Sequence, residues 1–527
     1  MKRLVLAIAC ACSANPKPHS IASSSEPAAA APAPEIVRVD TGALRGARSG
    51  EVVAWKGIPY AAPPVGELRW RPPAPALTWS GVRDASGFGS VCVQGGSSTE
   101  PTATAMGSED CLTLNVWAPP HASALPVMVF VHGGYFTWGS SSYRRFGVDL
   151  YDGAHLARAA GVIVVTLNYR VGPFGFLAHA ALAAEDAHHA SGDYGLLDQL
   201  FALHWVQRNI AAFGGDPARV TLFGQSAGAV STAALYASPL SPGLFAGAIM
   251  HSGNGEAISM ARAEAAGAEL ARRLHCDSIA CMRGKSASQI ATALPESFTN
   301  TGYSYGPVVD GYVLPARPQQ LVDRGDGMHV PLIVATTTNE YSTMVKSVLE
   351  RPMLTPDDYQ RSLADRFGLR LANKIVERYP AASFTSLLAP YTTVRRDAGF
   401  VCGSDRFADA ASKHAPVYRF VYDHTMSAGP LVPLGAGHGL DLYFVFRNTP
   451  AKYITLDDHE RALSDALVGY WSRFAHAGDP NGANAARWPA RTSEGHEQFA
   501  VDDQLHVTTP TETSRCEFWK PIIHDRP

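Results

Sequence analysis

Residues 220–228, which read VTLFGQSAG, decide the fold of this chain. Four β-prone residues lead directly into a Gly-x-Ser-x-Gly motif, and an Ala-rich, helix-prone stretch follows at residues 229–236. The motif alone is weak, but a serine on a tight turn between a strand and a helix projects its hydroxyl into a cleft. The flanking glycines keep that turn free of side-chain collisions. The context therefore predicts that Ser226 is a nucleophile rather than part of an ordinary Gly/Ser turn.

Short, continuous apolar runs recur along the chain, with helical patterns such as residues 196–209 between them. Runs of this kind are typical of strands in a parallel sheet that helices cover on both faces. We therefore predict an α/β fold with a mostly parallel central sheet and helices on both faces. The predicted strands are residues 127–131, 162–165, 220–223, 249–251 and 332–334.

Residues 132–136 read HGGYF and follow the predicted strand that ends at Val131. A glycine-rich loop at that place can bring backbone N–H groups next to a carbonyl group under attack. Such donors stabilise the charge that develops on the oxygen, typically by about 2.7–4 kcal/mol each. We predict an oxyanion hole formed by the N–H groups of Gly134, Tyr135 and Ala227. The alternative is a flexible glycine loop without this role.

The composition narrows the classes of function. The chain has 527 residues, a formal net charge of −3 and 46% hydrophobic residues. We find no basic stripe, so we expect no nucleic-acid partner. No stretch of about 18 apolar residues is present, so we expect no transmembrane helix. The oligomeric state stays open, with a monomer favoured.

The N-terminus has the features of a targeting segment. Lys2 and Arg3 precede a short apolar run, so residues 1–12 are predicted to be a signal peptide. Residues 7–10 loosely resemble a lipoprotein box, so a cleaved signal and a lipid anchor both remain open. Residues 13–35 are rich in Ala, Ser and Pro and are predicted to be a disordered tether. The protein is therefore expected to be exported: secreted, periplasmic or lipid-anchored to the envelope.

Eight cysteines are present, two of them in the predicted signal peptide. The remaining six suggest three disulfides in an exported protein, although six unpaired thiols are the alternative. Six cysteines allow 15 connectivities, and the residues alone do not choose among them.

Several motifs together carry a family resemblance. The longest stretch, FGGDPARVTLFGQSAG, spans residues 213–228, and EDCLTLNVW spans residues 109–117. Residues 57–61 with 68–70, and residues 471–481, match further family segments. Over about residues 36–520 the chain resembles the type-B carboxylesterases, a family that includes bacterial para-nitrobenzyl esterases.

The resemblance implies an α/β-hydrolase fold with large loop insertions, and residues 36–527 are accordingly expected to form one catalytic domain. It implies hydrolysis of a small-molecule carboxylic ester through an acyl-enzyme. It calls for no metal and no organic cofactor.

The resemblance also implies the partners of Ser226. The acid is Glu340, which follows the family-like segment at residues 330–334, and the base is His438 in GAGHG at residues 435–439. The order Ser, Glu, His along the chain is the one expected for this fold. The family pairs its cysteines as Cys92–Cys111, Cys276–Cys281 and Cys402–Cys516.

Several departures from the family pattern, and several aromatic side chains, bear on the site and its substrate. Tyr135 stands where the family usually has Gly or Ala, so we expect it to narrow the pocket against bulky alcohol groups. Tyr341 follows Glu340 where Gly is usual, which could shift the acid. Gln225 stands where cholinesterases carry Glu, and no Trp lies between Cys92 and Cys111, which disfavours choline esters. The predicted pocket residues are Gln225, Phe136, Phe298 and Tyr305, although core packing explains the aromatic rings nearly as well.

Three other functions are alternatives to hydrolysis of small esters. A lipase acting on long-chain esters would need an extended apolar lid, which we cannot identify. Acyl transfer to another alcohol would use the same acyl-enzyme. A non-catalytic binding protein of this fold would lack triad residues, and all three are present here. Neither the substrate nor the acyl-chain preference follows from the sequence.

Overall fold

The structure is a computed structural model of the chain, and residues Pro34–Pro527 form one compact unit. The predicted signal peptide and residues 13–34 of the predicted tether lie outside the described residues. The described ranges are 35–95, 105–119, 122–293, 298–299, 302–303, 305–344, 353, 355–449, 452–492, 495–510 and 513–524.

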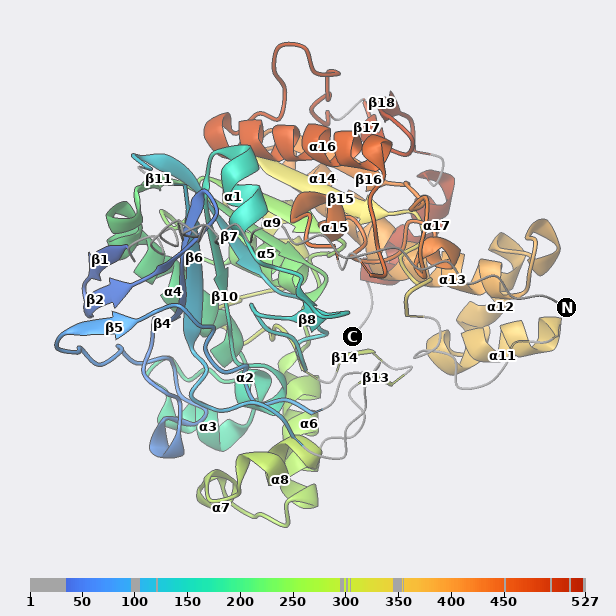
Figure 1. Ribbon diagram of the computed structural model, residues 1–527. Helices are drawn as coiled ribbons and strands as arrows, with labels where there is room; N and C mark the ends of the chain where they lie inside the picture. The colour runs from blue at the N-terminus through green and yellow to red at the C-terminus, as the bar shows by residue number, and fades with distance from the viewer. Residues whose placement is uncertain are drawn as a thin grey trace, which may run out of the picture. The chain divides into compact units, whose positions relative to one another are not determined.

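The centre of the molecule is an 11-stranded sheet (Figure 1). Seven neighbouring strands run parallel, and antiparallel strands extend the sheet at both edges. The parallel strands, in spatial order, are β10 (Ile163–Leu167), β7 (Leu125–Val131), β11 (Gly215–Gln225), β12 (Gly247–His251), β15 (Leu332–Thr337), β16 (Val417–Tyr422) and β17 (Gln498–Val501). The antiparallel strands are β18 (Leu505–Thr508) on one side and β6 (Thr113–Ala118), β4 (Val52–Pro59) and β3 (Ala47–Ser49) on the other.

Each of the five predicted strands coincides with a parallel strand. The run at residues 162–165 begins one residue before its strand, because β10 begins at Ile163.

Alternate side chains of one strand enter two different cores. In β7, Val129 packs in the core on one face, whereas Met128 and Phe130 pack in the core on the other. Continuous apolar runs are therefore required, because both faces of the strand are buried.

Helices cover both faces of the sheet. On one face lie α4 (Tyr194–Asn209), α5 (Ala227–Ala237) and α9 (Pro318–Arg324), and on the other lie α1 (Ala154–Ala160) and α16 (Asp458–Ala477) (Figure 1). The helix predicted at residues 196–209 is α4, which begins two residues earlier. The predicted mostly parallel sheet with helices on both faces is confirmed.

A third core lies outside the sheet, on the opposite side of the molecule from β1 (Ile36–Val39), which belongs to a separate three-stranded sheet (Figure 1). Its helices are α11 (Pro356–Phe367), α12 (Leu369–Arg378), α13 (Leu388–Arg396) and α17 (Thr513–His524). Tyr341 and Met344 also pack in this core, so it adjoins the segment that carries Glu340.

Three disulfides join Cys92 to Cys111, Cys276 to Cys281 and Cys402 to Cys516, the pairs that the resemblance implies. The last one ties α17 to α14 (Cys402–Ala411), which packs on the sheet. Within the described ranges, no helix combines the length and the apolar composition that crossing a bilayer requires.

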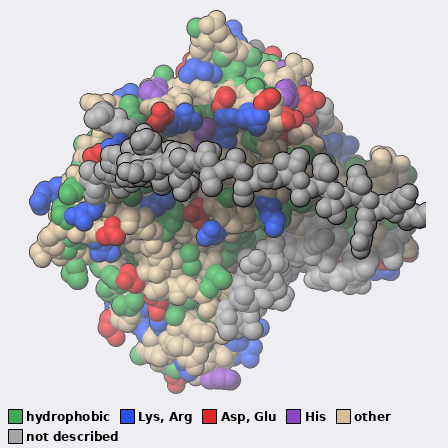
Figure 2. Space-filling model, in the orientation of Figure 1, with side chains coloured by type: hydrophobic (Ala, Val, Ile, Leu, Met, Phe, Trp, Pro, Cys, Tyr) green, Lys and Arg blue, Asp and Glu red, His purple; other side chains and the backbone are tan. Residues whose placement is uncertain are grey.

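Acidic and basic side chains are interspersed on the face of the molecule that Figure 2 shows, rather than gathered by sign. This mixture agrees with the small net charge of the chain.

Candidate active site

Ser226 lies on a sharp turn between β11 and α5, and we call this turn, residues 224–228, the elbow. Its backbone has φ 58° and ψ −122°, and its N–H donates to the carbonyl oxygen of His251 at 2.8 Å. A Cβ on Gly224 would lie 2.3 Å from the carbonyl oxygen of Gly228, and one on Gly228 would lie 2.0 Å from that of Val131. Both positions therefore require glycine, and the predicted strand–turn–helix context of the motif is present.

The loop after β7 lies directly against this turn. A Cβ on Gly133 would lie 3.0 Å from the Cβ of Ser226. Gly134 has φ 116°, and a Cβ there would lie 2.0 Å from the carbonyl oxygen of Trp138. The loop thus brings its backbone next to the serine, as an oxyanion hole requires. Ala227 is the first residue of α5, where a backbone N–H has no partner within the helix.

Glu340 and His438 form a hydrogen-bonded pair. The Nδ1 atom of His438 lies 2.5 Å from Oε2 of Glu340, and the backbone N–H of Thr337 donates to Oε1 at 2.8 Å. Glu340 is fully buried. Its loop also joins the histidine loop through the backbone, because the Asn339 N–H donates to the carbonyl oxygen of Ala436 at 3.0 Å. Two carboxylate oxygens with separate partners fix the orientation of the acid.

Tyr341 does not separate Glu340 from the histidine. Its ring turns into the third core, where it lies 5.6 Å from the ring of Phe400 and below the guanidinium of Arg395. The shift of the acid that the sequence left open is therefore not large enough to break the pair with His438.

The second ring nitrogen of His438 has a partner that sequence reasoning missed. Its Nε2 atom lies 3.0 Å from the side-chain Nε2 of Gln225. The ring of Phe400 covers one side of the imidazole, with the centroids 4.8 Å apart. In this structure the hydrogen bond to Nε2 therefore comes from the residue before Ser226 and not from the serine itself.

Two of the other three predicted pocket residues are buried in the core, and the side chain of the third is not described. Phe136 is fully buried and packs edge-on against Phe176 at 5.1 Å. Tyr305 is also buried in the core, and burial raises the pKa of its hydroxyl. Phe298 lies in a two-residue strand, but its side chain is outside the described part of the chain. Core packing therefore accounts for Phe136 and Tyr305.

Tyr135 has φ 55° and its hydroxyl contacts the sulfur of Met344. The contact links the loop after β7 to the segment just after Glu340, because Met344 packs with Tyr341 in the third core. The predicted effect of Tyr135 on the pocket stays a prediction.

A buried pair near Ser226, formed by His251 and Asp441, was also not predicted from the sequence. Nδ1 of His251 lies 2.6 Å from Oδ2 of Asp441, and the indole N–H of Trp471 donates to Nε2 at 3.3 Å. His251 accepts the Ser226 N–H through its backbone, and Asp441 stands three residues after His438. The pair therefore connects β12, the strand beside β11, to the loop that carries His438.

The ring of His132 contacts the loop after β7, which this residue begins. Its buried ring stacks on Tyr169 with centroids 4.4 Å apart, and Nδ1 lies 2.8 Å from the carbonyl oxygen of Gly133. Burial lowers the pKa of His132 to about 4. The ring is therefore neutral near pH 7, which allows it to sit in an uncharged interior.

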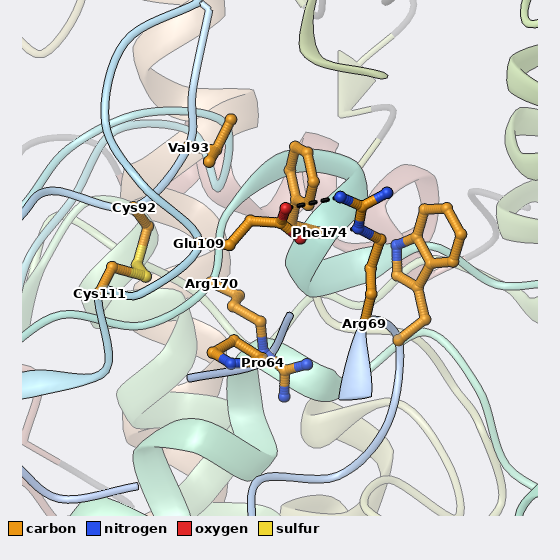
Figure 3. A pocket seen from close by; sticks show the side chains of 9 residues that line it. Pro64, Arg69, Cys92, Val93, Glu109, Cys111, Arg170 and Phe174 are labelled. Carbon is orange, nitrogen blue, oxygen red and sulfur yellow. Dashed lines mark hydrogen bonds and ion pairs between the residues drawn. A yellow bond between two sulfur atoms is a disulfide. The ribbon is translucent and has the colours of Figure 1, made fainter. Parts of the chain in front are cut away.

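A small cavity lies apart from these residues (Figure 3). It borders the Cys92–Cys111 disulfide and the ion pair in which Arg69 and Glu109 approach to 2.6 Å. Neither Ser226 nor His438 lines it, so we assign it no part in the chemistry. Within the described residues, no three His, Cys, Asp or Glu side chains are grouped as metal ligands.

Known proteins resemble this chain over nearly its whole length. The sequence matches the profile of the Carboxylesterase family over residues 33–519. It is 35% identical to the para-nitrobenzyl esterase of Bacillus subtilis (strain 168), covering 91% of this chain and 97% of that protein. It is 34% identical to the cocaine esterase of Homo sapiens, covering 91% and 89%. A solved thermophilic PNB esterase superposes with a TM-score of 0.80 at 34% identity, covering 92% of this chain and 99% of that one.

The sheet, the helices on both faces and these structural neighbours define the class: the protein has the α/β-hydrolase fold, as predicted. Within that class, the chain belongs to the carboxylesterase family, which confirms the resemblance seen in the sequence. It is a carboxylic-ester hydrolase.

Proposed function

We propose that the protein hydrolyses small carboxylic esters through an acyl-enzyme on Ser226, with His438 as the base and Glu340 as the acid. The observation that carries this proposal is the 2.5 Å contact between His438 and Glu340 beside a serine at a strained elbow. Glycines leave room for residues 132–136, which we call the oxyanion loop, to lie against the serine, and this supports the same assignment.

In the proposed reaction, Nε2 of His438 takes the hydroxyl proton of Ser226 while Oγ bonds to the ester carbonyl carbon. Glu340 holds the Nδ1–H tautomer and stabilises the imidazolium that forms. The N–H groups of Gly134, Tyr135 and Ala227 bind the oxygen that becomes negative.

The carbon–oxygen bond to the alcohol then breaks, and His438 returns its proton to the leaving oxygen. Water attacks the acyl-enzyme with the same imidazole as base, releasing the carboxylic acid and restoring the serine. The cycle uses only groups of this chain and water.

We propose that residues 36–527 form the single catalytic domain and that the protein is exported. The three disulfides support export, because such bonds persist in oxidising compartments. We further propose that the enzyme acts as a monomer.

Steady-state hydrolysis of para-nitrophenyl acetate by purified variants tests the proposal. We expect Ser226→Ala and His438→Ala each to lower kcat by about 10⁴-fold or more, and Glu340→Gln to lower it strongly, with the thermal midpoint retained. Undiminished turnover by folded Ser226→Ala would contradict the proposal.

A further inference from the structure

The side chain of Gln225 sits between the two loops that serve the proposed chemistry. It is 5% exposed. A Cβ on Gly133, in the oxyanion loop, would lie 3.1 Å from its Oε1 atom, and one on Gly439, just after the proposed base, would lie 3.3 Å from its Nε2 atom. Glycine on either side thus leaves the space that the amide fills. An amide enclosed in this way has little freedom to point elsewhere.

The contact with His438 fixes the roles of the atoms. A histidine whose Nδ1–H donates to a carboxylate presents a lone pair at Nε2 when it is neutral. The Gln225 amide N–H can donate to that lone pair across the observed 3.0 Å. A carboxylate in the same place could only accept, so it would favour the protonated ring instead.

We propose that Gln225 is a positioning residue for the base: its amide N–H holds the ring of His438 with Nε2 facing the elbow, until Ser226 replaces it as the partner of Nε2. The inference rests on the proposed function of Ser226 and His438. It assigns Gln225 to the base rather than to the substrate pocket, where sequence reasoning placed it.

Apart from Glu340, the nearby charged groups have partners other than His438, so Gln225 is the residue that contacts Nε2. Glu340 contacts Nδ1, and Phe400 covers the ring without charge. On the elements that pack nearby, other charges are directed elsewhere: Asp441 contacts His251, and Asp397, on the helical turn that carries Phe400, contacts Arg515 and Tyr379. His132 of the oxyanion loop faces the carbonyl oxygen of Gly133.

Two variants separate the amide's donor role from its size. Gln225→Glu keeps the shape and replaces the donor by an anion, whereas Gln225→Met keeps the length and removes the hydrogen bond. The measurement is kcat/KM for para-nitrophenyl acetate from pH 5 to pH 9.5, whose acid limb reports protonation of the free enzyme's base.

In Gln225→Glu, we expect the acid limb of the kcat/KM profile to move to higher pH by about one to two units, because a nearby anion favours the charged ring. Activity should be largely regained at high pH. Gln225→Met should move the acid limb in the same direction by less. An unmoved limb in Gln225→Glu, or an equal loss in both variants at every pH, would overturn the inference and would indicate a merely structural role.

The proposed function is tested separately in the same series. If Ser226→Ala is inactive while the limb of Gln225→Glu stays at the position of the unmodified enzyme, the triad stands and only the role of Gln225 fails. If Ser226→Ala retains activity, the proposed function fails as well.

Discussion

Ser226, Tyr135 and Phe136 are not glycines, yet they have positive φ angles of 58°, 55° and 62°. Such conformations cost on the order of 1–3 kcal/mol each and persist only where surrounding contacts impose them. Here the Ser226 N–H is held by His251, and the carbonyl oxygen of Phe136 accepts from the Gly172 N–H at 2.5 Å. Ser226, which is proposed to attack the ester, and Tyr135, which is proposed to bind its oxygen, therefore both have strained backbone conformations.

At the scale of residues, the sequence allowed the prediction of Ser226 from its own context, because the elbow leaves a local signature of strand, glycines and helix. Glu340 and His438 needed the family resemblance, because nothing in a 19-histidine chain singles them out locally. The contact of Gln225 with His438 joins residues 213 positions apart and depends on side-chain orientation, which no sequence pattern encodes.

Asp310 gives a pH-dependent prediction. Burial raises the pKa of its carboxyl to about 6, although the N–H groups of Tyr312 and Leu314 donate to it. Folding therefore favours the protonated form, so the contribution of Asp310 to stability is largest at low pH and is lost as the pH rises from about 4 to 6. Asp310→Asn keeps an acceptor oxygen without the charge, and we expect it to have a higher Tm than the unmodified protein at pH 7.5.

The control is the same comparison at pH 4, where both side chains are neutral and the difference in Tm should nearly vanish. A difference that is equal at both pH values would show that the carboxylate is not destabilised by its surroundings.

At the scale of elements, the parallel strands could be predicted because strands buried on both faces need continuous apolar runs. The third core was not predicted, because it is assembled from distant segments. Helices α11 and α12 bury their apolar sides against α13 and α17, and α17 begins more than 130 residues after α12 ends. Helical periodicity can indicate an apolar stripe, but not what covers it.

The His251–Asp441 pair connects two elements, β12 and the loop of the proposed base, and it can be tested as a pair. Removing His251 leaves the buried carboxyl group of Asp441 without its hydrogen-bond partner, which costs about 1–3 kcal/mol, and more for a charged group. We therefore expect His251→Leu to lower the urea midpoint strongly. Adding Asp441→Leu should restore part of that loss, because the buried carboxylate is removed as well.

The measurement is a double-mutant cycle of urea midpoints for the two single variants and the double variant. Additive losses would mean that the two side chains do not depend on each other.

At the scale of the whole molecule, the disulfides differ in how much they constrain the unfolded chain. Cys402 and Cys516 are 114 residues apart, whereas Cys276 and Cys281 are 5 apart. In the chain-entropy account the long loop contributes about 5 kcal/mol and the short one about 2 kcal/mol. The long one also fastens the third core, and with it the surroundings of Tyr341, to the sheet.

The central claim is that Ser226 becomes acylated, and the most direct measurement is the site of covalent labelling by a fluorophosphonate. The enzyme is treated with the probe, digested, and mapped by peptide mass. We expect one adduct per chain on the peptide that contains Ser226; para-nitrophenyl acetate should slow its formation, and Ser226→Ala should not form it. Inactivation with the adduct on another residue, or equal labelling of Ser226→Ala, would contradict the claim.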